Sequence, residues 1–290
     1  MPDRAVLAPH ERSSEVSRDR QSAPIGVFDS GVGGLTVLKE LRRQLAGEST
    51  IYLGDEARMP YGPRPAAEVI EFTRQAMRWF AKRECKLIVL ACNTATAQAL
   101  EAVRDESAVP MIGVVRPGAA AAIAASARRS IGVLATVGTV RSGAYVRAVR
   151  DLDPLCDVTQ QACPKLVPIV ESGKAGTPEA LEAVREYVAP LLTEGGVVRP
   201  VVDTLLLGCT HYPLLREEFT KVAGPGVRIV DSATTTALAV REVLLSHRLL
   251  ADGATPKHRV FATGPIDRFT EVARTIFGEK LPEVEEATLT

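Results

Sequence analysis

Two cysteines carry the clearest chemical signal in this sequence, and each stands at the end of a similar stretch. Cys92 follows the mostly apolar run at residues 86–91, and Cys209 follows the run at residues 203–208. Both runs are rich in branched side chains and have the length of a fully buried strand. Ligands of open parallel sheets bind at the carboxyl ends of the strands. Both thiols therefore fall where chemistry would be placed, which predicts a site between two similar halves.

The residues beside the two cysteines fit a small charged ligand. A free cysteine is protonated at neutral pH, but a helix N-terminus or a nearby base makes the thiolate accessible. Both cysteines stand where a strand is expected to lead into a helix, so backbone N–H groups there can support an anion. Polar groups follow directly, at Asn93, Thr94 and Thr96 in one half and at Thr210 and His211 in the other. These groups suit a carboxylate or an ammonium group rather than an extended apolar ligand.

Each thiol also has a candidate acid–base partner. His211 lies two residues past Cys209, and Asp29 comes from the end of a neighbouring strand. Two thiols across a cleft could approach one carbon from opposite faces, one removing a proton and the other delivering one, which inverts a stereocentre. The alternative is that each cysteine is a small buried hydrophobe. Two cysteines at equivalent strand ends, each followed by polar residues, favour the catalytic interpretation.

The first of the elements that position these groups is a strand–turn–helix unit. Residues 25–28 predict a short buried strand, followed by Asp29, Ser30 and a glycine turn, and residues 35–45 have helical spacing. A dinucleotide-binding G-x-G-x-x-G turn would require glycine at position 36, which is Thr36, so the match fails. Asp29 and Ser30 would face a ligand bound at this strand end. The alternative is that one of them only caps the following helix.

The same order of elements then repeats. Residues 131–136 echo residues 25–30, the strand before the second cysteine echoes the strand before the first, and residues 227–232 echo residues 111–115. Three pairs in the same order at nearly constant offsets predict an internal duplication. The expected fold is α/β, with two pseudo-symmetric doubly wound parallel-sheet domains and the active site between them. Other expected elements are strands at 50–53, 109–115 and 259–263, a helix at 65–83, and a last helix through Ile276 that completes the chain.

Composition places the chain among ordinary globular proteins. Its 290 residues are 46% hydrophobic and 24% charged, enough for two modest domains with proper cores. The formal net charge is zero, so electrostatics favour neither a nucleic acid nor an anionic membrane as partner. No apolar run reaches the length of a transmembrane helix, and residues 1–23 lack the apolar segment of a secretory signal. Residues 1–23 are interpreted as a disordered extension, and the expected location is cytoplasmic.

The five cysteines fit neither a disulfide framework nor a metal motif. An odd count in such a chain argues against a framework of disulfides, and no C-x-x-C pair is present. Cys209 and His211 could supply two metal ligands, but no ordered set of further ligands completes them, so no metal is expected. Cys85, Cys156 and Cys163 are expected to be structural.

Four motifs of this sequence stand out when taken together. They are residues 25–38 (IGVFDSGVGGLTVL), residues 52–55 (YLGD) continuing to residues 60–62 (PYG), residues 91–96 (ACNTAT) and residues 207–214 (LGCTHYPL). These motifs resemble those of the glutamate racemases, and the resemblance runs from Pro24 to about Gly278. The wider aspartate/glutamate racemase superfamily shares the Cys-Asn-Thr and Gly-Cys-Thr cores, but not usually the His-Tyr-Pro continuation found here.

The resemblance implies a cofactor-independent enzyme that interconverts L- and D-glutamate and supplies D-glutamate for peptidoglycan, without metal, PLP or nucleotide. It implies a first α/β domain formed by residues 24–116 plus 231–290 and a second formed by residues 117–230. Dimers are common in the family, so a homodimer is expected. From the residues alone, the substrate is defined only as a small zwitterionic amino acid.

The resemblance also implies roles for individual residues. Cys92 and Cys209 act as the two bases, assisted by Asp29 on the Cys92 side and by His211 on the Cys209 side. The cysteine that matches Cys92 serves the D-enantiomer, and the one that matches Cys209 serves the L-enantiomer. Positions that match substrate-holding residues are Asp29, Ser30, Tyr61, Gly62, Asn93, Thr94, Thr136, Thr210 and His211, with Glu171 as a further acidic residue associated with the site.

Three residues depart from the family pattern. Glu56 stands where Thr or another small residue is usual, Met59 where Cys is frequent, and Arg116 where Glu or Lys is common. None of them is a proposed base, so they bear on loop contacts or regulation rather than on the reaction.

Three other functions remain open from the sequence. One is a racemase or lyase of the same superfamily that acts on aspartate, a hydantoin or an arylmalonate. Another is a non-catalytic module that senses an amino acid between two lobes. The third is a thiol redox sensor that uses Cys92 and Cys209, although strand ends in different domains need not bring two sulfurs within bonding range.

Overall fold

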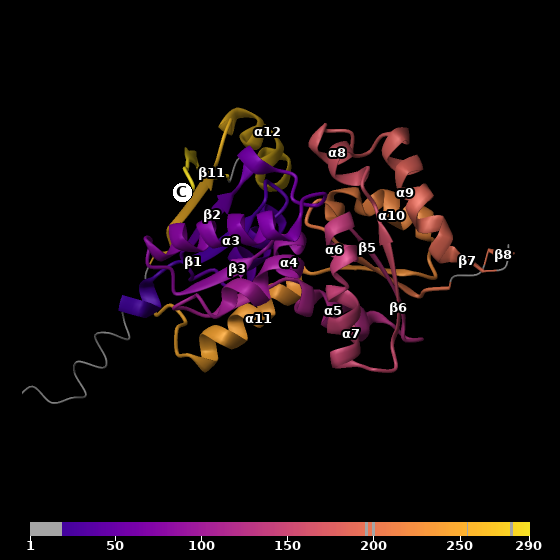
Figure 1. Cartoon of the computed structure of the whole chain (residues 1–290), viewed down its shortest axis with the longest axis horizontal. Coiled ribbons are helices and arrows are strands. Elements are labelled where there is room, and N and C mark those ends of the chain that lie inside the picture. The colour runs from indigo at the N-terminus through magenta and orange to yellow at the C-terminus, as the bar shows by residue number, and fades with distance from the viewer. Residues whose placement is uncertain (1–18, 195–196, 199–200, 254, 279–280) are drawn as a thin grey trace, which may run out of the picture.

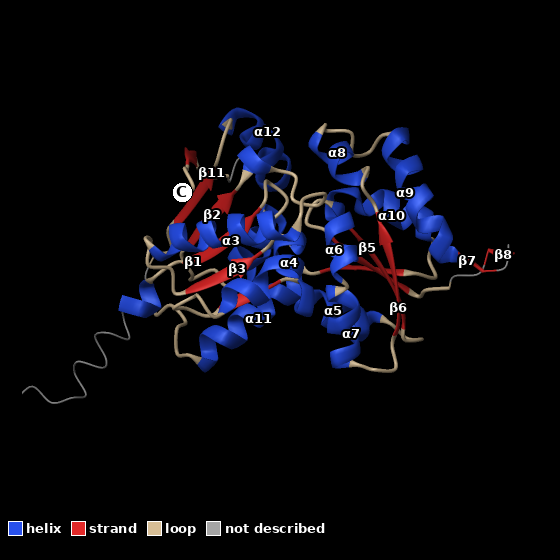
Figure 2. Ribbon diagram, in the orientation of Figure 1, coloured by secondary structure: helices blue, strands red, loops and turns tan. Residues whose placement is uncertain are grey.

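The chain forms two lobes, each built around a parallel β-sheet (Figure 1, Figure 2). The computed structural model describes residues 19–194, 197–198, 201–253, 255–278 and 281–290. The chain builds most of the first lobe, crosses to the second, and returns to complete the first, as the colours of Figure 1 show. Both lobes can therefore contribute residues to a site where they meet.

The first lobe contains a six-stranded parallel sheet in the order β12–β11–β2–β1–β3–β4. Strand β1 lies between β2 and β3 and pairs with both from its first residue, Ile25. The carboxyl ends of these three strands therefore lie at one edge of the sheet. The strands are β1 (Ile25–Asp29), β2 (Thr50–Gly54), β3 (Leu87–Leu90), β4 (Met111–Gly113), β11 (His258–Ala262) and β12 (Val284–Glu286).

The second lobe repeats the inner part of this topology. Its four-stranded parallel sheet has the succession β6–β5–β9–β10, which matches β2–β1–β3–β4 strand for strand. Cys92 follows β3 and Cys209 follows β9, so the two cysteines follow equivalent strands. The predicted fold of two parallel-sheet α/β units is confirmed. The strands are β5 (Ser130–Ala135), β6 (Asp157–Ala162), β9 (Thr204–Gly208) and β10 (Arg228–Asp231), and a separate antiparallel pair is formed by β7 (Thr193–Glu194) and β8 (Val197–Val198).

Each sheet separates two hydrophobic clusters. Because successive side chains of a strand point to opposite faces, Leu87 and Val89 pack on one face of the first sheet, and Ile88 and Leu90 pack on the other. Burying one such side chain contributes about 1.5–3 kcal/mol, so the apolar runs hold each sheet firmly. Because these strands are buried on both faces, polar residues are found at the strand ends rather than within the strands.

Helices cover both faces of each sheet. Helix α11 returns from the second lobe and packs against α2 of the first, and α4 packs against α6 across the two lobes. The helices of the first lobe are α2 (Leu35–Gln44), α3 (Ala66–Ala81), α4 (Asn93–Arg104), α11 (Ala233–Ser246) and α12 (Ile266–Phe277). Those of the second are α5 (Val115–Ala125), α6 (Val137–Ser142), α7 (Ala144–Leu152), α8 (Leu166–Glu171), α9 (Pro178–Leu192) and α10 (Arg216–Ala223). Two 3-10 turns are η1 (Glu56–Arg58) and η2 (Tyr212–Leu215).

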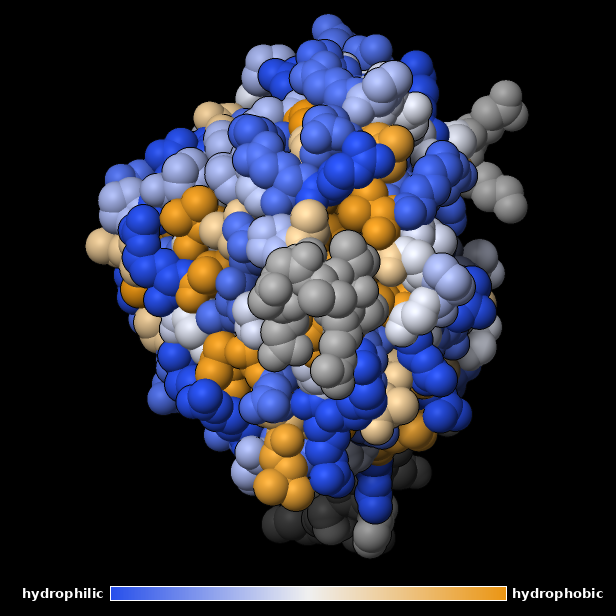
Figure 3. Space-filling model, turned by 90° about the vertical axis from the view of Figure 1, so that its right-hand side faces the viewer, coloured by the Kyte–Doolittle hydropathy of each residue, from blue (hydrophilic) through white to orange (hydrophobic). Residues whose placement is uncertain are grey.

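The surface of the molecule is mixed in character. Figure 3 looks at the far end of the second lobe, where hydrophobic residues form separate patches among hydrophilic ones. Among the described residues, none of the helices combines the length and the apolar content that a membrane span requires. The predicted domain boundaries stay predictions, because sheet membership assigns strands to lobes without fixing where each domain ends.

Three elements differ from the sequence-based expectation. The strand expected at residues 109–115 is shortened to β4, because Val115 already begins α5. The strand expected at residues 259–263 is not the last, because β12 adds an edge strand beside β11. Strand β6 has no counterpart among the expected strands. Its sequence, DVTQQA, is polar and lies half-exposed at the edge of the second sheet, so no apolar run marks it.

Order begins earlier than expected. Residues 19–22 are helical, which differs from the disorder predicted for residues 1–23; the earlier part of that extension lies outside the described residues. Lys86 Nζ donates to the Gln21 carbonyl at 2.6 Å and forms a buried ion pair with Glu48 at 2.5 Å. A buried charge without its partner would be strongly destabilising, so Glu48 holds Lys86 in place. The hydrogen bond from Lys86 then ties Gln21 to the first sheet.

Candidate active site

The residues predicted for the site gather where the two lobes meet. Thr94 Oγ1 and Thr136 Oγ1 lie 2.9 Å apart across the lobes, and Thr210 Oγ1 donates to Asp29 Oδ1 at 3.4 Å. Strand ends of both sheets are thus joined by hydrogen bonds. All of these predicted residues are buried: Asp29, Ser30, Tyr61, Gly62, Cys92, Asn93, Thr94, Thr136, Glu171, Cys209, Thr210 and His211.

Cys92 is held by the first turn of α4. Its Sγ accepts a hydrogen bond from the Ala95 backbone N–H at 3.4 Å, and its S–H donates to Ser30 Oγ at 3.5 Å. The helix N-terminus favours negative charge on sulfur, but the loss of water has the larger effect. Burial raises the pKa of Cys92 to about 12, and the nearby charge of Asp29 adds to the rise. Cys92 is therefore a thiol at neutral pH, in the state that can deliver a proton.

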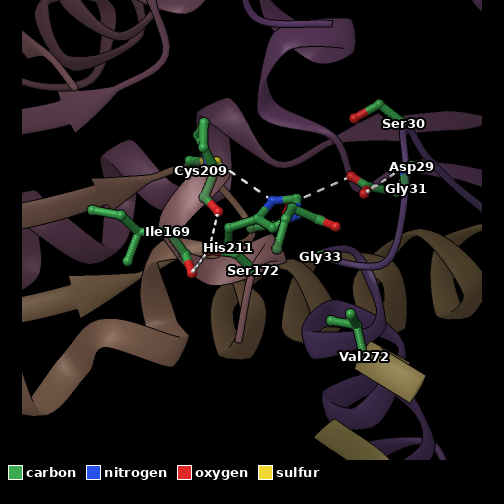
Figure 4. Close-up of polar contacts among 12 residues, drawn as sticks. Asp29, Ser30, Gly31, Gly33, Ile169, Ser172, Cys209, His211 and Val272 are labelled. Carbon is green, nitrogen blue, oxygen red and sulfur yellow. Dashed lines mark hydrogen bonds and ion pairs between the residues drawn. The ribbon is translucent and has the colours of Figure 1, made fainter. Parts of the chain in front are cut away.

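Cys209 faces the imidazole ring of His211. Its Sγ lies 3.9 Å from Nδ1, and Nε2 of the ring lies 2.5 Å from Glu171 Oε1. Figure 4 shows the ring between Cys209 and the turn that carries Asp29. Burial by itself would lower the pKa of His211, but the hydrogen bonds to Cys209 and Glu171 outweigh it and raise the pKa well above its ordinary value. His211 is therefore an imidazolium at neutral pH, and its ring stands beside the sulfur of Cys209.

The two thiols thus stand in different surroundings. Cys92 caps an α-helix, whereas Cys209 is followed by the 3-10 turn η2 and not by the helix that its sequence predicts. So short a turn has little backbone dipole, and the His211 imidazolium supplies the positive charge instead. One thiol keeps its proton and the other has a cation at its side, so the site can remove a proton on one side and deliver one on the other.

Asp29 reaches from the first lobe to the second. Its Oδ2 accepts from the Gly31 backbone N–H at 3.1 Å, and its Oδ1 accepts from Thr210 (Figure 4). Burial raises the pKa of Asp29 to about 6, while the charge of His211 opposes the rise. Gly33 of the same turn is so close to the second lobe that a Cβ there would lie 2.4 Å from Thr210 Oγ1 and 2.7 Å from His211 Nδ1. The glycine turn therefore allows the two lobes to approach.

Asn93 adds a contact that the sequence does not reveal. Its Nδ2 donates to the hydroxyl of Tyr145 on α7 of the second lobe at 2.6 Å. Asn93 Oδ1 is buried and has no hydrogen-bond partner among the described residues. Tyr145 is absent from the predicted site because nothing near it in the sequence marks it as a partner of Asn93. The free oxygen of Asn93 is an acceptor that suits an ammonium group.

Tyr61 and Gly62 make contacts that hold the structure of the site. The Tyr61 hydroxyl donates to Asp55 Oδ2, which also accepts from Arg58 Nε at 2.7 Å. The Gly62 carbonyl accepts from the Gly138 backbone N–H of the second lobe at 2.8 Å. Tyr61 therefore holds the loop after β2, and Gly62 joins that loop to α6.

The side chains of the site do not form a metal-binding group. Cys209, His211 and Glu171 lie in a row in which the imidazole bridges sulfur and carboxylate. Within the described ranges, no group of three or more His, Cys, Asp and Glu side chains is arranged to hold a metal ion. The row is a hydrogen-bonded relay rather than a set of ligands around one point.

Comparison with known proteins matches the fold and the site to one family. The family model for Asp/Glu/Hydantoin racemases matches residues 25–240. A glutamate racemase of Lactiplantibacillus plantarum is 45% identical over 257 residues, 88% of this chain and 92% of that protein. The crystal structure of a glutamate racemase isoform from Bacillus anthracis matches with a TM-score of 0.87 at 41% identity, over 93% of this chain and 98% of that one. A glutamate racemase of Francisella tularensis, solved in complex with D-glutamate, matches with a TM-score of 0.84 at 30% identity, over 92% and 98% of the two chains.

The protein is thus a two-lobed α/β protein in which each lobe places one buried cysteine, Cys92 or Cys209, where the lobes meet. The chain belongs to the Asp/Glu/Hydantoin racemase family, and its relatives place it with the glutamate racemases.

Replacing Glu171 is expected to lower the pKa of His211. Glu171→Gln removes the carboxylate charge that lies 2.5 Å from Nε2 but keeps the size of the side chain. Because that charge favours the imidazolium, the pKa of His211 should fall in the variant. The imidazole resonances in NMR spectra report this titration directly, and with four histidines in the chain the signal can be assigned.

Glu179→Gln is the matched control, because Glu179 is an exposed glutamate of α9 that pairs with Lys174. The His211 titration should be unchanged in this variant. An unchanged titration in Glu171→Gln would contradict the assignment of Glu171 as the group that holds the imidazolium.

Proposed function

We propose that this protein is a cofactor-independent glutamate racemase that interconverts L- and D-glutamate with two cysteine bases. The observation that carries the proposal is a buried thiol from each lobe at one interlobe site, with Ser30 beside Cys92 and His211 beside Cys209. Glutamate as the substrate is supported by the relatives that are named glutamate racemases, one of them solved with D-glutamate.

The reaction is a proton transfer on each face of one carbon. From L- to D-glutamate, the Cys209 thiolate takes the Cα proton, and the electron pair of the broken C–H bond stays on the substrate. The Cys92 thiol then gives its proton to the opposite face of Cα, which inverts the centre. Cys209 ends as a thiol and Cys92 as a thiolate, and the reverse reaction exchanges their roles. No electron is gained or lost, so the reaction requires no oxidant or reductant.

The surroundings of the two thiols support these roles. Burial raises the pKa of Cys92 to about 12, so this thiol holds the proton that must be delivered. The His211 imidazolium lies 3.9 Å from Cys209 Sγ, on the side where the proton is removed. Each turnover leaves Cys209 with one proton more and Cys92 with one proton fewer, so Cys209 must lose a proton to water and Cys92 must gain one before the same direction can run again.

The polar residues of the site would hold the amino acid and stabilise its carbanion. Asn93 Oδ1 can accept a hydrogen bond from the substrate ammonium. The N-terminus of α4 and the hydroxyl groups of Thr94, Thr136 and Thr210 can donate to its carboxylates. Donors fixed in a site without water stabilise developing negative charge far better than donors in water. Asp29 and Ser30 complete the first-lobe side of the site, and Tyr61 contributes through the loop that it holds.

The biological setting follows from the family. We propose that the enzyme supplies D-glutamate for peptidoglycan synthesis in the cytoplasm, acts as a homodimer, and has no nucleic-acid or membrane partner. Its small-molecule partner is glutamate. No cofactor is assigned, because the chain itself supplies both the proton acceptor and the proton donor.

Proton NMR in D₂O tests the proposed function. Purified protein is incubated separately with L- and D-glutamate, and loss of the Cα–H signal is followed together with optical rotation. We expect both enantiomers to exchange the Cα proton for deuterium and to lose optical activity at the same final composition. Protein without added metal or PLP should be as active as protein supplemented with either.

Three other results would contradict the proposal. Exchange of aspartate but not of glutamate would overturn the substrate. Tight glutamate binding without exchange would favour an amino-acid-sensing module. Reversible disulfide formation between Cys92 and Cys209 without racemisation would favour a redox sensor.

A methyl group on Gly33 is expected to impair turnover without destabilising the fold. The site residues are buried, so the substrate must enter when the lobes part and react when they close. In Gly33→Ala the added Cβ would clash with Thr210 and His211 of the other lobe only when the lobes are closed. We expect kcat/KM to fall by about tenfold or more, because the reacting groups lose their alignment. The melting temperature should change little.

Gly47→Ala is the control for this variant, because no atom lies within 4 Å of a Cβ added there. Its turnover and melting temperature should match those of the parent protein. Full turnover in Gly33→Ala would show that the close approach of this turn to the second lobe is not needed.

A further inference from the structure

Glu56 brings a carboxylate against the turn that carries Asp29. It begins the 3-10 turn η1 of the first lobe and is half-buried. Its Oε2 is buried and has no hydrogen-bond partner within the part of the chain that the structure describes. A Cβ on Gly31 would lie 3.2 Å from this oxygen. Burying this oxygen without a hydrogen bond costs much free energy when the carboxyl group is ionised, and much less when the group is protonated and neutral.

Glu171 presents a second such oxygen from the other lobe. Its Oε1 binds His211, whereas its Oε2 is buried without a hydrogen-bond partner among the described residues. Arg268 Nη2, from α12 of the first lobe, lies 3.9 Å from this Oε2, and the arginine side chain is 60% exposed. Because the ion pair is long and the arginine is exposed, it contributes little to stability. Glu171 and Arg268 line a cavity of about 700 Å³ between α8 and α12, at the junction of the lobes.

The charges around Glu56 come from every element packed near it. They are Glu171 at the end of α8, Arg268 of α12, His211 before η2 and Asp29 at the end of β1. Burial and then the charge of Glu171 raise the pKa of Glu56 to about 7, while Arg268 and His211 oppose the rise. Glu56 of the first lobe and Glu171 of the second lobe, both acidic, therefore lie near each other where the lobes meet.

We propose that Glu56 is a positioning residue that couples closure of the two lobes to the uptake of one proton. A neutral Glu56 lets the lobes close without bringing two negative charges together. An ionised Glu56 repels Glu171 and competes with it for Arg268. Glu56 thus acts through Glu171, which holds His211, and does not touch the reacting atoms. The proposal rests on the proposed function, because glutamate is the ligand over which the lobes close.

The direction of the pH dependence follows from the two forms of the protein. In the closed form burial and the charge of Glu171 raise the pKa of Glu56 to about 7. When the lobes part, Glu56 loses the neighbouring charge of Glu171, so its pKa is lower in the open form. Closure is therefore fully favoured at low pH and weakens as the pH rises toward about 7. Through this group alone, KM for D-glutamate should rise severalfold between about pH 5.5 and about pH 7.5.

The first test compares KM and kcat across this pH range in the parent protein and in two variants. Glu56→Gln keeps the length of the side chain but cannot ionise, so its KM should lose the rise and stay near the low-pH value of the parent. The matched control is Glu271→Gln, which removes a charge from an exposed residue of α12 that lines the same cavity. Its KM should rise with pH as in the parent protein. The values of kcat should change far less than those of KM.

The second test counts protons by calorimetric titration with D-glutamate in two buffers of different ionisation enthalpy. At about pH 6 the parent protein should take up more protons on binding than Glu56→Gln, and Glu271→Gln should match the parent. Equal proton uptake in the parent and Glu56→Gln, or an unchanged rise of KM in Glu56→Gln, overturns this proposal and leaves the racemase function standing. A parent protein that neither binds nor racemises glutamate overturns the proposed function itself, together with closure over glutamate.

Discussion

The exclusion of water from the place where the two sheets meet is the constraint on which the chemistry depends. Cysteines in water have similar pKa values, so two exposed thiols would be equivalent. Between the lobes, burial raises the pKa of Cys92 to about 12 and that of Asp29 to about 6. Burial alone would lower the pKa of His211. That pKa is raised instead, because hydrogen bonds to Cys209 and Glu171 stabilise the imidazolium. The two thiols are thus buried beside different partners, Ser30 for Cys92 and His211 for Cys209.

The fold supplies both the pairing of the thiols and the freedom of the lobes to part. Equivalent strands β3 and β9 carry Cys92 and Cys209 to the meeting edges of two similar sheets. Within each lobe many buried apolar side chains hold the sheet. Across the lobes the contacts are fewer: α4 packs on α6 and α11 on α5, and the polar contacts are single hydrogen bonds worth about 0.5–1.5 kcal/mol each.

How far the sequence predicts this structure depends on where the determining contacts lie. The inner strands are apolar runs, so the equivalent positions of Cys92 and Cys209 could be predicted from local pattern alone. Strand β6 could not, because its polar residues at the sheet edge carry no such run. The contact of Asn93 with Tyr145 depends on how two lobes dock, which no local pattern encodes. Glu56 is visible in the sequence only as a departure from the family, since its surroundings are built from both lobes.

The most direct test of the two-thiol account is the primary deuterium isotope effect at Cα in Cys92→Ser and Cys209→Ser. Because L- and D-glutamate have equal free energies, kcat/KM for the unlabelled enantiomers is the same in both directions for any variant, and rates alone cannot assign a thiol to a face. A serine hydroxyl is a much poorer base than a thiolate, so the step in which it must remove the proton becomes rate-limiting. In Cys209→Ser the isotope effect should be larger for Cα-deuterated L-glutamate than for the D-enantiomer, and in Cys92→Ser the order should reverse. Equal isotope effects for both enantiomers in both variants, or full activity in either, would contradict the account.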